Sequence, residues 1–206
     1  MNLSKIKRFL RIIFKSSCLF EKKLERGWNS DINNHRVKDK ALIYLSEKFN
    51  LLHLVETGTN YGETLWALRH YFKTIASIEL EDVRYYSTRK RFRKFNNIRI
   101  IQGDSGEVLK TIINDFKEPV LFWLDAHYDG GNTALGKRYT PIISELDTIL
   151  NSPLEHIILI DDAHTFINQL IPDYPTIKEL KLIVNGYKKN YDVFVKNNMI
   201  WIEKQI

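Results

Sequence analysis

Short apolar runs alternate with amphipathic segments along most of the chain. Five runs read as strands buried on both faces, because they are brief, continuous and rich in branched side chains. They lie at 52–55, 75–78, 98–101, 120–124 and 157–160. Two last runs, 192–195 and 199–202, are joined by Lys196-Asn197-Asn198 and predict a β-hairpin.

Helices are predicted between these strands, where apolar residues recur at helical spacing. The expected ranges are 37–49, 62–72, 82–95, 105–116, 140–150 and 175–184. Ser105 is a candidate N-cap, and Pro141 and Pro175 stand where a proline begins a helix. Strands alternating with helices predict an α/β domain over residues 37–206, with a doubly wound, mostly parallel sheet that ends in an antiparallel pair.

Residues 1–36 follow a different pattern and predict a basic amphipathic helical arm. Between residues 3 and 14 the apolar side chains form one helical stripe, while lysines and arginines cover the other face. Two roles are open for residues 1–23. They can pack on the domain or on a second copy in self-association, or they can make peripheral contact with an anionic membrane surface.

Composition narrows the class of protein only modestly. The 206 residues, 44% of them hydrophobic, suit one globular domain behind the arm, and the single cysteine, Cys18, belongs to no disulfide or metal-binding spacing. Without an 18-residue apolar run or a signal-peptide pattern, a cytoplasmic location is expected, either free or at the inner membrane surface. The net charge of +6 lies largely in the arm, and no basic platform interleaved with aromatics predicts a nucleic-acid partner.

Acidic residues follow the strand-like runs. Since ligands of open α/β sheets bind outside the carboxyl ends of the strands, these acids should gather at one edge of the sheet. They are Glu56, Glu79, Asp104, Asp125, Asp161 and Asp162.

The loop after the first run, Glu56-Thr57-Gly58-Thr59-Asn60-Tyr61-Gly62, is the strongest motif. A glycine-bearing turn between a strand and a helix lets backbone N–H groups approach a ligand closely. Asn60 tolerates the left-handed conformation that such a turn needs, and Glu56 suits a ligand that carries an amino group. Glu79 lies 23 residues further on, near the offset of about 20 residues at which an acid binds ribose hydroxyls.

These residues resemble the class I S-adenosylmethionine-dependent methyltransferases over roughly 52–206. The loop is similar to their first motif, E/D-x-G-x-G-x-G, with Asn60 at the middle glycine. The resemblance implies a seven-stranded sheet of order 3-2-1-4-5-7-6 and S-adenosylmethionine as cofactor. It assigns the methionine part to the loop, the ribose to Glu79 and the adenine to the segment after the third strand. The implied cofactor residues are Glu56, Gly58, Thr59, Asn60, Gly62, Glu79, Gly103, Asp104, Ser105 and Asp125.

Three carboxylates, those of Asp125, Asp161 and Asp162, are expected together beyond the fourth and fifth strands. They would repel one another unless a cation lay between them, and an all-oxygen set favours Mg²⁺ or another hard divalent ion. The pattern resembles the metal site of divalent-ion-dependent O-methyltransferases that act on sugars of natural products. The alternative is that Asp161 caps a loop and Asp162 is solvated.

His127, two residues after Asp125, is the first candidate for a general base, because methyl transfer to a hydroxyl requires proton removal. The alternatives are that His127 is a metal ligand or a loop residue with a structural role. His164 is the second candidate base. The polar stretch from Gly130 to Tyr139 is a candidate lid.

The sequence therefore predicts an S-adenosylmethionine-dependent O-methyltransferase with a saccharide or other small-molecule acceptor. The preference for a saccharide follows from the resemblance alone. Two other classes stay open, namely a non-catalytic partner or scaffold in a surface-glycan pathway and a sugar-nucleotide-modifying enzyme of another reaction type. A degenerate site has no physical need for these acids, so their joint presence argues against it. The five are Glu56, Glu79, Asp104, Asp125 and Asp161.

Overall fold

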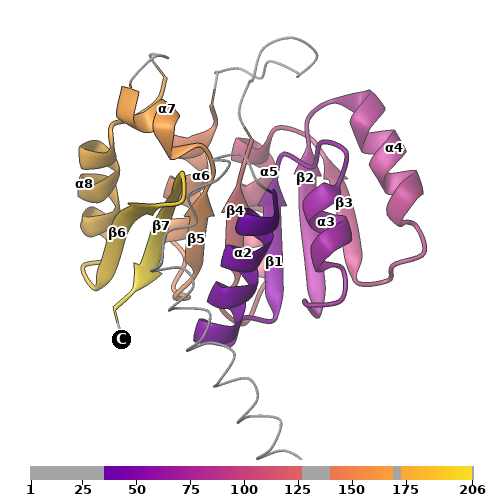
Figure 1. Cartoon of the computed structure of the whole chain (residues 1–206), viewed down its shortest axis with the longest axis horizontal. Helices are drawn as coiled ribbons and strands as arrows, with labels where there is room; N and C mark the ends of the chain where they lie inside the picture. The colour runs from indigo at the N-terminus through magenta and orange to yellow at the C-terminus, as the bar shows by residue number, and fades with distance from the viewer. Residues whose placement is uncertain (1–34, 127–139, 169–172, 206) are drawn as a thin grey trace, which may run out of the picture. The chain divides into compact units, whose positions relative to one another are not determined.

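The computed structural model describes residues 35–126, 140–168 and 173–205. These residues form one seven-stranded sheet of order β3-β2-β1-β4-β5-β7-β6 with helices on both faces (Figure 1). The predicted fold class and strand order are thus confirmed. The strands are β1 (His53–Thr57), β2 (Thr74–Glu79), β3 (Ile98–Gln102), β4 (Leu121–Leu124), β5 (Ile157–Ile160), β6 (Tyr191–Lys196) and β7 (Met199–Lys204).

The direction of winding changes between β1 and β4. Strand β1 pairs in parallel with β2 on one side and with β4 on the other, so the chain proceeds outward to β3 before it returns to β4. Strand β5 continues the parallel set, and β7 then pairs with it in antiparallel fashion. A crevice is expected at such a switch point, outside the carboxyl ends of β1 and β4.

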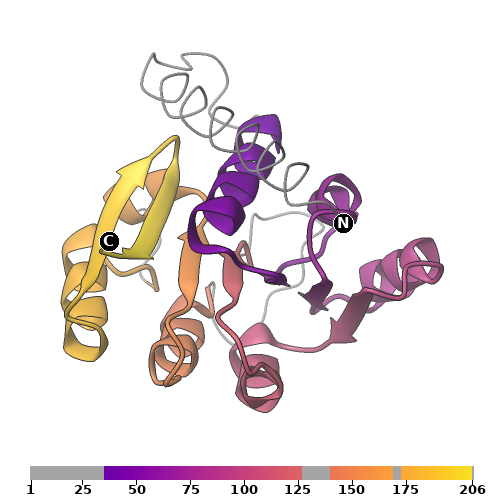
Figure 2. The same cartoon turned by 90° about the horizontal axis from the view of Figure 1, so that it is seen from below.

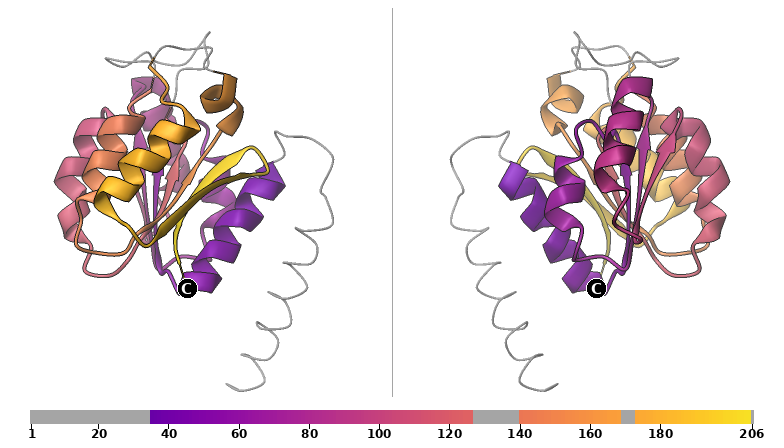
Figure 3. Two further views of the ribbon diagram at one scale, coloured as in Figure 1. Left: turned by 90° about the vertical axis from the view of Figure 1, so that its left-hand side faces the viewer. Right: turned by 90° about the vertical axis from the view of Figure 1, so that its right-hand side faces the viewer.

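Two layers of helices cover the sheet, as the end-on view shows (Figure 2). One layer buries a core with Leu42, Leu65 and Phe92, and the other a core with Leu109, Leu146 and Leu180. The first layer holds α2 (His35–Phe49), α3 (Glu63–Leu68) and α4 (Asp82–Phe92), and the second holds α5 (Ser105–Ile112), α6 (Ile142–Leu150) and α8 (Ile177–Tyr187). The side views show the sheet between them (Figure 3).

The terminal hairpin forms where the sequence predicts it. Its two-residue turn, Asn197-Asn198, has φ values of 54° and 57°, and the flanking Lys196 and Met199 pair across the strands. Positive φ at both central positions matches the right-handed twist of the strands, and asparagine accepts this conformation more easily than most residues. The turn also brings Asn198 beside the end of β5.

Several helix ends differ from the prediction. The helix expected over 62–72 ends at Leu68, because Asn97 Nδ2 donates hydrogen bonds to the carbonyls of Arg69 (2.9 Å) and Phe72 (3.1 Å) in the turn that follows. The 105–116 segment ends its α-helix at Ile112 and continues as a short 3₁₀-helix, Ile113–Asp115.

The N-terminal ends of three helices also differ from the prediction. Pro141 is the N-cap of α6, which begins at Ile142, and is not its first helical residue. The N-cap of α5 is Asp104, not Ser105, since its carboxylate accepts a hydrogen bond from Gly106 N (2.9 Å). Helix α8 is capped by Thr176 in a reciprocal pair with Glu179, one residue after Pro175.

The six-residue helix α7 (Ala163–Asn168) was not predicted, because one and a half turns carry too few apolar positions to show a period.

The predicted amphipathic arm lies almost entirely outside the described residues, and its two possible roles stay predictions. Within the described ranges no helix is long and apolar enough to cross a membrane.

Candidate functional site

The loop after β1 has the backbone that close approach of a ligand requires. Gly58, Asn60 and Gly62 all have positive φ, at 84°, 49° and 74°. Gly62 N donates to Thr59 O (2.8 Å), which closes a tight turn directly before α3. The left-handed conformation predicted for Asn60, where the family motif has glycine, is therefore present.

Gly58 lies against the backbone that follows β4. A Cβ atom on Gly58 would stand 2.5 Å from the carbonyl oxygen of Asp125 and 3.2 Å from Ala126 N. The N–H of Gly58 donates to Ile78 O (2.9 Å) at the end of β2. The loop is thus held between β2 and β4, and only glycine fits at its closest point.

Glu56 is buried at the end of β1, with 2% of its surface exposed. The Ser77 hydroxyl donates to Glu56 Oε2 (2.5 Å), and the Thr59 hydroxyl lies 2.6 Å from Ser77 Oγ. Burial raises the pKa of Glu56 to about 8, against the opposing effect of hydrogen bonds from Ser77 and Thr64. The carboxyl group is therefore largely protonated near neutral pH until a cationic group approaches it.

Glu79 holds the same loop from β2. Its Oε2 accepts a hydrogen bond from Asn60 N (2.7 Å), and its Oε1 accepts one from Glu81 N (2.9 Å). Each carboxylate oxygen can accept a further hydrogen bond, so both remain available to hydroxyl groups. Asn60 and Glu79 are thereby brought together, as the sequence predicts.

The segment after β3 lies next to Glu79. Gly103 N donates to Glu79 O (2.9 Å), and Gly103 itself has φ 142°. Asp104 uses one carboxylate oxygen to cap α5, which leaves the other oxygen for a ligand. Ser105 is buried at the start of the helix.

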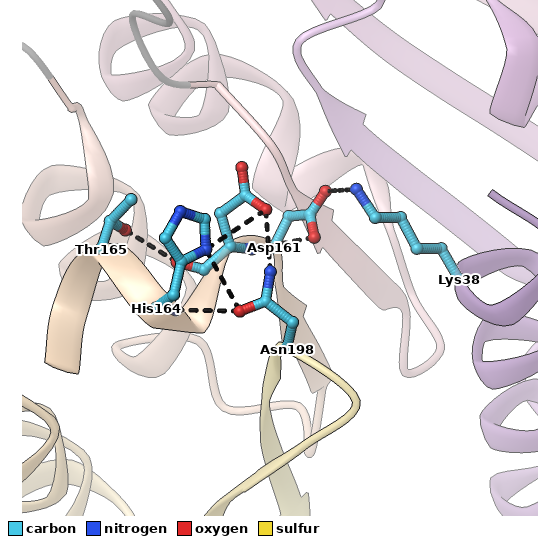
Figure 4. A network of polar contacts seen from close by, with 6 residues as sticks. Lys38, Asp161, His164, Thr165 and Asn198 are labelled. Atoms are coloured by element: carbon cyan, nitrogen blue, oxygen red, sulfur yellow. Dashed lines mark hydrogen bonds and ion pairs between the residues drawn. The ribbon is translucent and has the colours of Figure 1, made fainter. Parts of the chain in front are cut away.

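The far side of the crevice carries an ion pair that the sequence analysis missed. Lys38 Nζ of α2 contacts Asp161 Oδ2, and Asp161 Oδ1 accepts a hydrogen bond from Asp162 N (2.8 Å) (Figure 4). Burial alone would lower the pKa of Lys38, but the negative charge of Asp161, with further contributions from Asp125 and Asp162, raises it above its ordinary value. Lys38 is therefore an ammonium ion at neutral pH.

Asp162 and His164 form a second small network beside this pair. Asn198 Nδ2 donates to Asp162 Oδ1 (3.1 Å), while Asn198 Oδ1 accepts from His164 N (3.0 Å) and lies 3.2 Å from His164 Nδ1 (Figure 4). Asp162 has φ 51°, which turns the chain from β5 into α7. The terminal hairpin thus positions both residues.

The three carboxylates do not form the predicted divalent-ion site in this arrangement. Across residues 35–126, 140–168 and 173–205, no group of three His, Cys, Asp or Glu side chains is placed to hold a metal ion. Both oxygens of Asp161 already have partners, Lys38 and Asp162 N. A divalent ion on Asp161 would have to displace an ammonium ion.

His127 and the predicted lid lie outside the described residues, so both stay predictions. Two further site residues were not predicted, Ser77 and Lys38. Ser77 offered a signal, a lone hydroxyl in the apolar run Ile75-Ala76-Ser77-Ile78. Lys38 offered none, because lysines on a predicted helix are usually solvated.

Comparison with known proteins supports the fold by structure and not by sequence. No protein-family model and no curated protein matches the chain. Solved structures do match it. A methyltransferase of Podospora anserina bound to S-adenosylhomocysteine has a TM-score of 0.56 at 17% identity, over 100% of this chain and 97% of the other.

Two O-methyltransferases match similarly. One from Bacillus cereus, in complex with S-adenosylhomocysteine, has a TM-score of 0.59 at 13% identity, over 95% of this chain and 90% of its own. The other is from Streptomyces achromogenes, in complex with S-adenosylmethionine. It has a TM-score of 0.59 at 15% identity, over 82% of this chain and 80% of its own. At these identities the likeness establishes a Rossmann-like methyltransferase fold.

The fit of Gly58 can be tested by adding a methyl group. We expect Gly58→Ala to lower the free energy of unfolding by about 2–4 kcal/mol, because the alanine would be strained at positive φ and would overlap Asp125 O. Urea denaturation measures the loss. Gly186→Ala is the matched control, since a Cβ there meets nothing within 4 Å and the residue lies inside α8. Equal stability of the two variants would contradict the close approach.

The buried carboxyl group of Glu56 predicts a pH-dependent stability. Between its ordinary pKa of 4.5 and its folded pKa of about 8, the folded state holds a proton that the unfolded state has lost. Stability therefore falls as the pH rises through this window, by about 1.4 kcal/mol per unit. Burial lowers the pKa of His156 from 6.5 to about 4, which gives the opposite slope below pH 6.5, so the measurement belongs between pH 6.5 and 8.

We expect Glu56→Gln to remove most of this slope, because the amide does not titrate. Urea unfolding of the wild type and the variant at both pH values measures the difference. Glu107→Gln is the control, since Glu107 is an exposed carboxylate on α5. Identical slopes in wild type and Glu56→Gln would show that Glu56 is ionised in the folded protein.

Proposed function

We propose that the chain is an S-adenosylmethionine-dependent methyltransferase whose cofactor binds at the carboxyl ends of β1, β2 and β3. The observation that carries the proposal is the loop after β1. Gly58, Asn60 and Gly62 in this loop have positive φ values, and two buried acids lie beside it at the same edge of the sheet, Glu56 at the end of β1 and Glu79 at the end of β2. The likeness to structures that bind S-adenosylmethionine or S-adenosylhomocysteine supports this choice of ligand.

Each part of the cofactor has a suitable partner in this arrangement. The ammonium group of the methionine part would lie toward Glu56 and favour its ionised form, which burial otherwise disfavours. The backbone of Gly58, Thr59, Asn60 and Gly62 would border the same part. The ribose hydroxyls would donate to the unused lone pairs of Glu79, and the adenine would lie along Gly103, Asp104 and Ser105.

The reaction we propose is methyl transfer to a hydroxyl. The acceptor oxygen forms a bond to the methyl carbon as the bond from that carbon to the sulfonium breaks, which leaves a neutral thioether, and the hydroxyl proton passes to a base. His127 is the proposed base, with His164 as the second candidate. O-methyltransferases among the similar structures support an oxygen atom as the methyl acceptor, and we take it to be a hydroxyl oxygen.

The sequence after β4 also favours oxygen over a nucleic-acid base. Within the family that the sequence resembles, enzymes that methylate amino groups of nucleic-acid bases carry Asn or Asp followed by Pro-Pro and an aromatic residue at this point. This chain has Trp123-Leu124-Asp125-Ala126-His127 instead. We propose a saccharide or related small molecule as acceptor. No step of the proposal passes through a metal ion, because the described carboxylates do not fit one.

Cofactor binding is the direct test. We expect the wild type to bind S-adenosylhomocysteine in isothermal titration calorimetry, and Glu79→Ala to weaken the affinity by about 1–3 kcal/mol, the cost of leaving bound hydroxyls without a charged partner. Glu107→Ala, which removes an exposed carboxylate on α5, should bind as the wild type does. No binding by the folded wild type would reject the methyltransferase and favour the scaffold or the sugar-nucleotide enzyme.

The proposed base predicts a separate defect. With labelled S-adenosylmethionine and whichever sugar of a panel is methylated, His127→Ala should lower turnover by about 10²–10⁴-fold at unchanged S-adenosylhomocysteine affinity. The wild-type rate should rise with pH as the imidazole loses its proton. Full turnover in His127→Ala would remove His127 from the chemistry, and a similar loss in His164→Ala would transfer the role to that residue.

A further inference from the structure

The ion pair between Lys38 and Asp161 joins two segments that are 123 residues apart in the chain. Helix α2 carries Lys38 and packs on the sheet through Ala41, Leu42 and Leu45. Asp161 follows β5 directly and is 3% exposed. The side chain of Lys38 is 16% exposed, so its stem is mostly covered while the ammonium group reaches the crevice edge.

The negative charges of three acids act on this ammonium group. Asp161 contacts it, and Asp125 and Asp162 also act on it from the ends of β4 and β5. These are the three carboxylates from which a bound cation was predicted, because together they would otherwise repel one another. A unit positive charge that contacts one of them and is attracted by the other two relieves the same repulsion.

The aromatic ring of Trp123 also lies near the Lys38 ammonium group. The ammonium nitrogen lies 6.0 Å from the centroid of the Trp123 ring, at the edge of the range for cation–π attraction. Trp123 is 1% exposed, and its indole N–H is buried without a hydrogen-bond partner in the described part of the chain. A buried donor without an acceptor is costly unless a bound molecule supplies one.

We propose that the Lys38 ammonium group is the resident cation of this acidic edge and serves in place of the divalent ion that the sequence predicts. The edge then binds no Mg²⁺, and methyl transfer proceeds in the presence of a chelator. An ammonium group has three donors, and the described residues supply one acceptor, Asp161. The two remaining N–H donors can hold an oxygen of the acceptor molecule, which rests on the proposed function. The assignment of Lys38 as the resident cation does not rest on the proposed function.

The experiment measures Mn²⁺ as a probe for a hard divalent ion. The full-length protein is titrated with Mn²⁺, and the free ion is followed by electron paramagnetic resonance. We expect no saturable binding that depends on Asp161, so wild type and Asp161→Asn should give the same curve. Saturable binding by the wild type that Asp161→Asn abolishes would overturn the proposal, and this comparison needs no change at Lys38.

Removal of the ammonium group should create the missing site. We expect Lys38→Met to gain saturable Mn²⁺ binding and to lose thermal stability that Mn²⁺ restores, because the three carboxylates, no longer held by the ammonium group, would rearrange around the ion and be neutralised by it. Lys48→Met is the matched control. Lys48 lies on the same helix and is paired with Glu203 at 2.8 Å, away from the three acids. The Lys48→Met variant should lose an ion pair without gaining metal binding.

The outcomes separate this inference from the proposed function. A folded Lys38→Met that neither binds Mn²⁺ nor is stabilised by it would overturn the assignment of Lys38 to a cation position. Mn²⁺ binding gained equally by Lys48→Met would do the same. Failure of the wild type to bind S-adenosylhomocysteine, with the Mn²⁺ results as expected, would reject the methyltransferase and leave the resident cation in place.

Discussion

The approach of Gly58 to the backbone after β4 is the contact on which the described site depends. The N–H of Asp125, after β4, donates to Thr57 O of β1 at 3.1 Å. Gly58, the residue after Thr57, donates through its own N–H to Ile78 O of β2. Three neighbouring strands are therefore tied together where the winding reverses. Any larger residue at Gly58 would separate β1 from β4 and shift Glu56 relative to Asp125. The proposed cofactor side and the proposed acceptor side of the crevice are therefore coupled through Gly58.

The two most buried acids of the edge are stabilised in different ways. Glu56 accepts hydrogen bonds from the neutral donors Ser77 and Thr64, and burial favours its protonated form. Asp161 has an ammonium partner and stays paired. The difference suits the two halves of the proposed reaction, because a ligand with its own positive charge can ionise Glu56 on arrival. Asp161 cannot serve such a ligand while Lys38 remains.

Local pattern was sufficient to predict the strands, every described helix except α7, and the left-handed turn after β1. The continuous apolar runs gave the strands, and Asn60 could replace a glycine because asparagine tolerates positive φ. Individual side-chain hydrogen bonds set the details that the pattern did not show. Asp104 caps α5 in place of Ser105, and Asn97 ends α3 early by satisfying two carbonyls in the turn. Such choices depend on side-chain geometry, which periodicity does not carry.

The pairing at Lys38 could not be predicted for a different reason. A count of carboxylates at a sheet edge gives the charge that must be neutralised, but it does not say which cation does so. The candidates are a metal ion and a basic side chain from anywhere in the chain, and a fold packed from both faces offers several helices that can supply one. Helix α2 was read from its apolar stripe, which places Leu42 and Leu45 on the sheet. Once that stripe is buried, helical geometry fixes where its polar residues point, and Lys38, one turn before Leu42, reaches the end of β5. The identity of the cation at this edge is thus a consequence of how α2 packs.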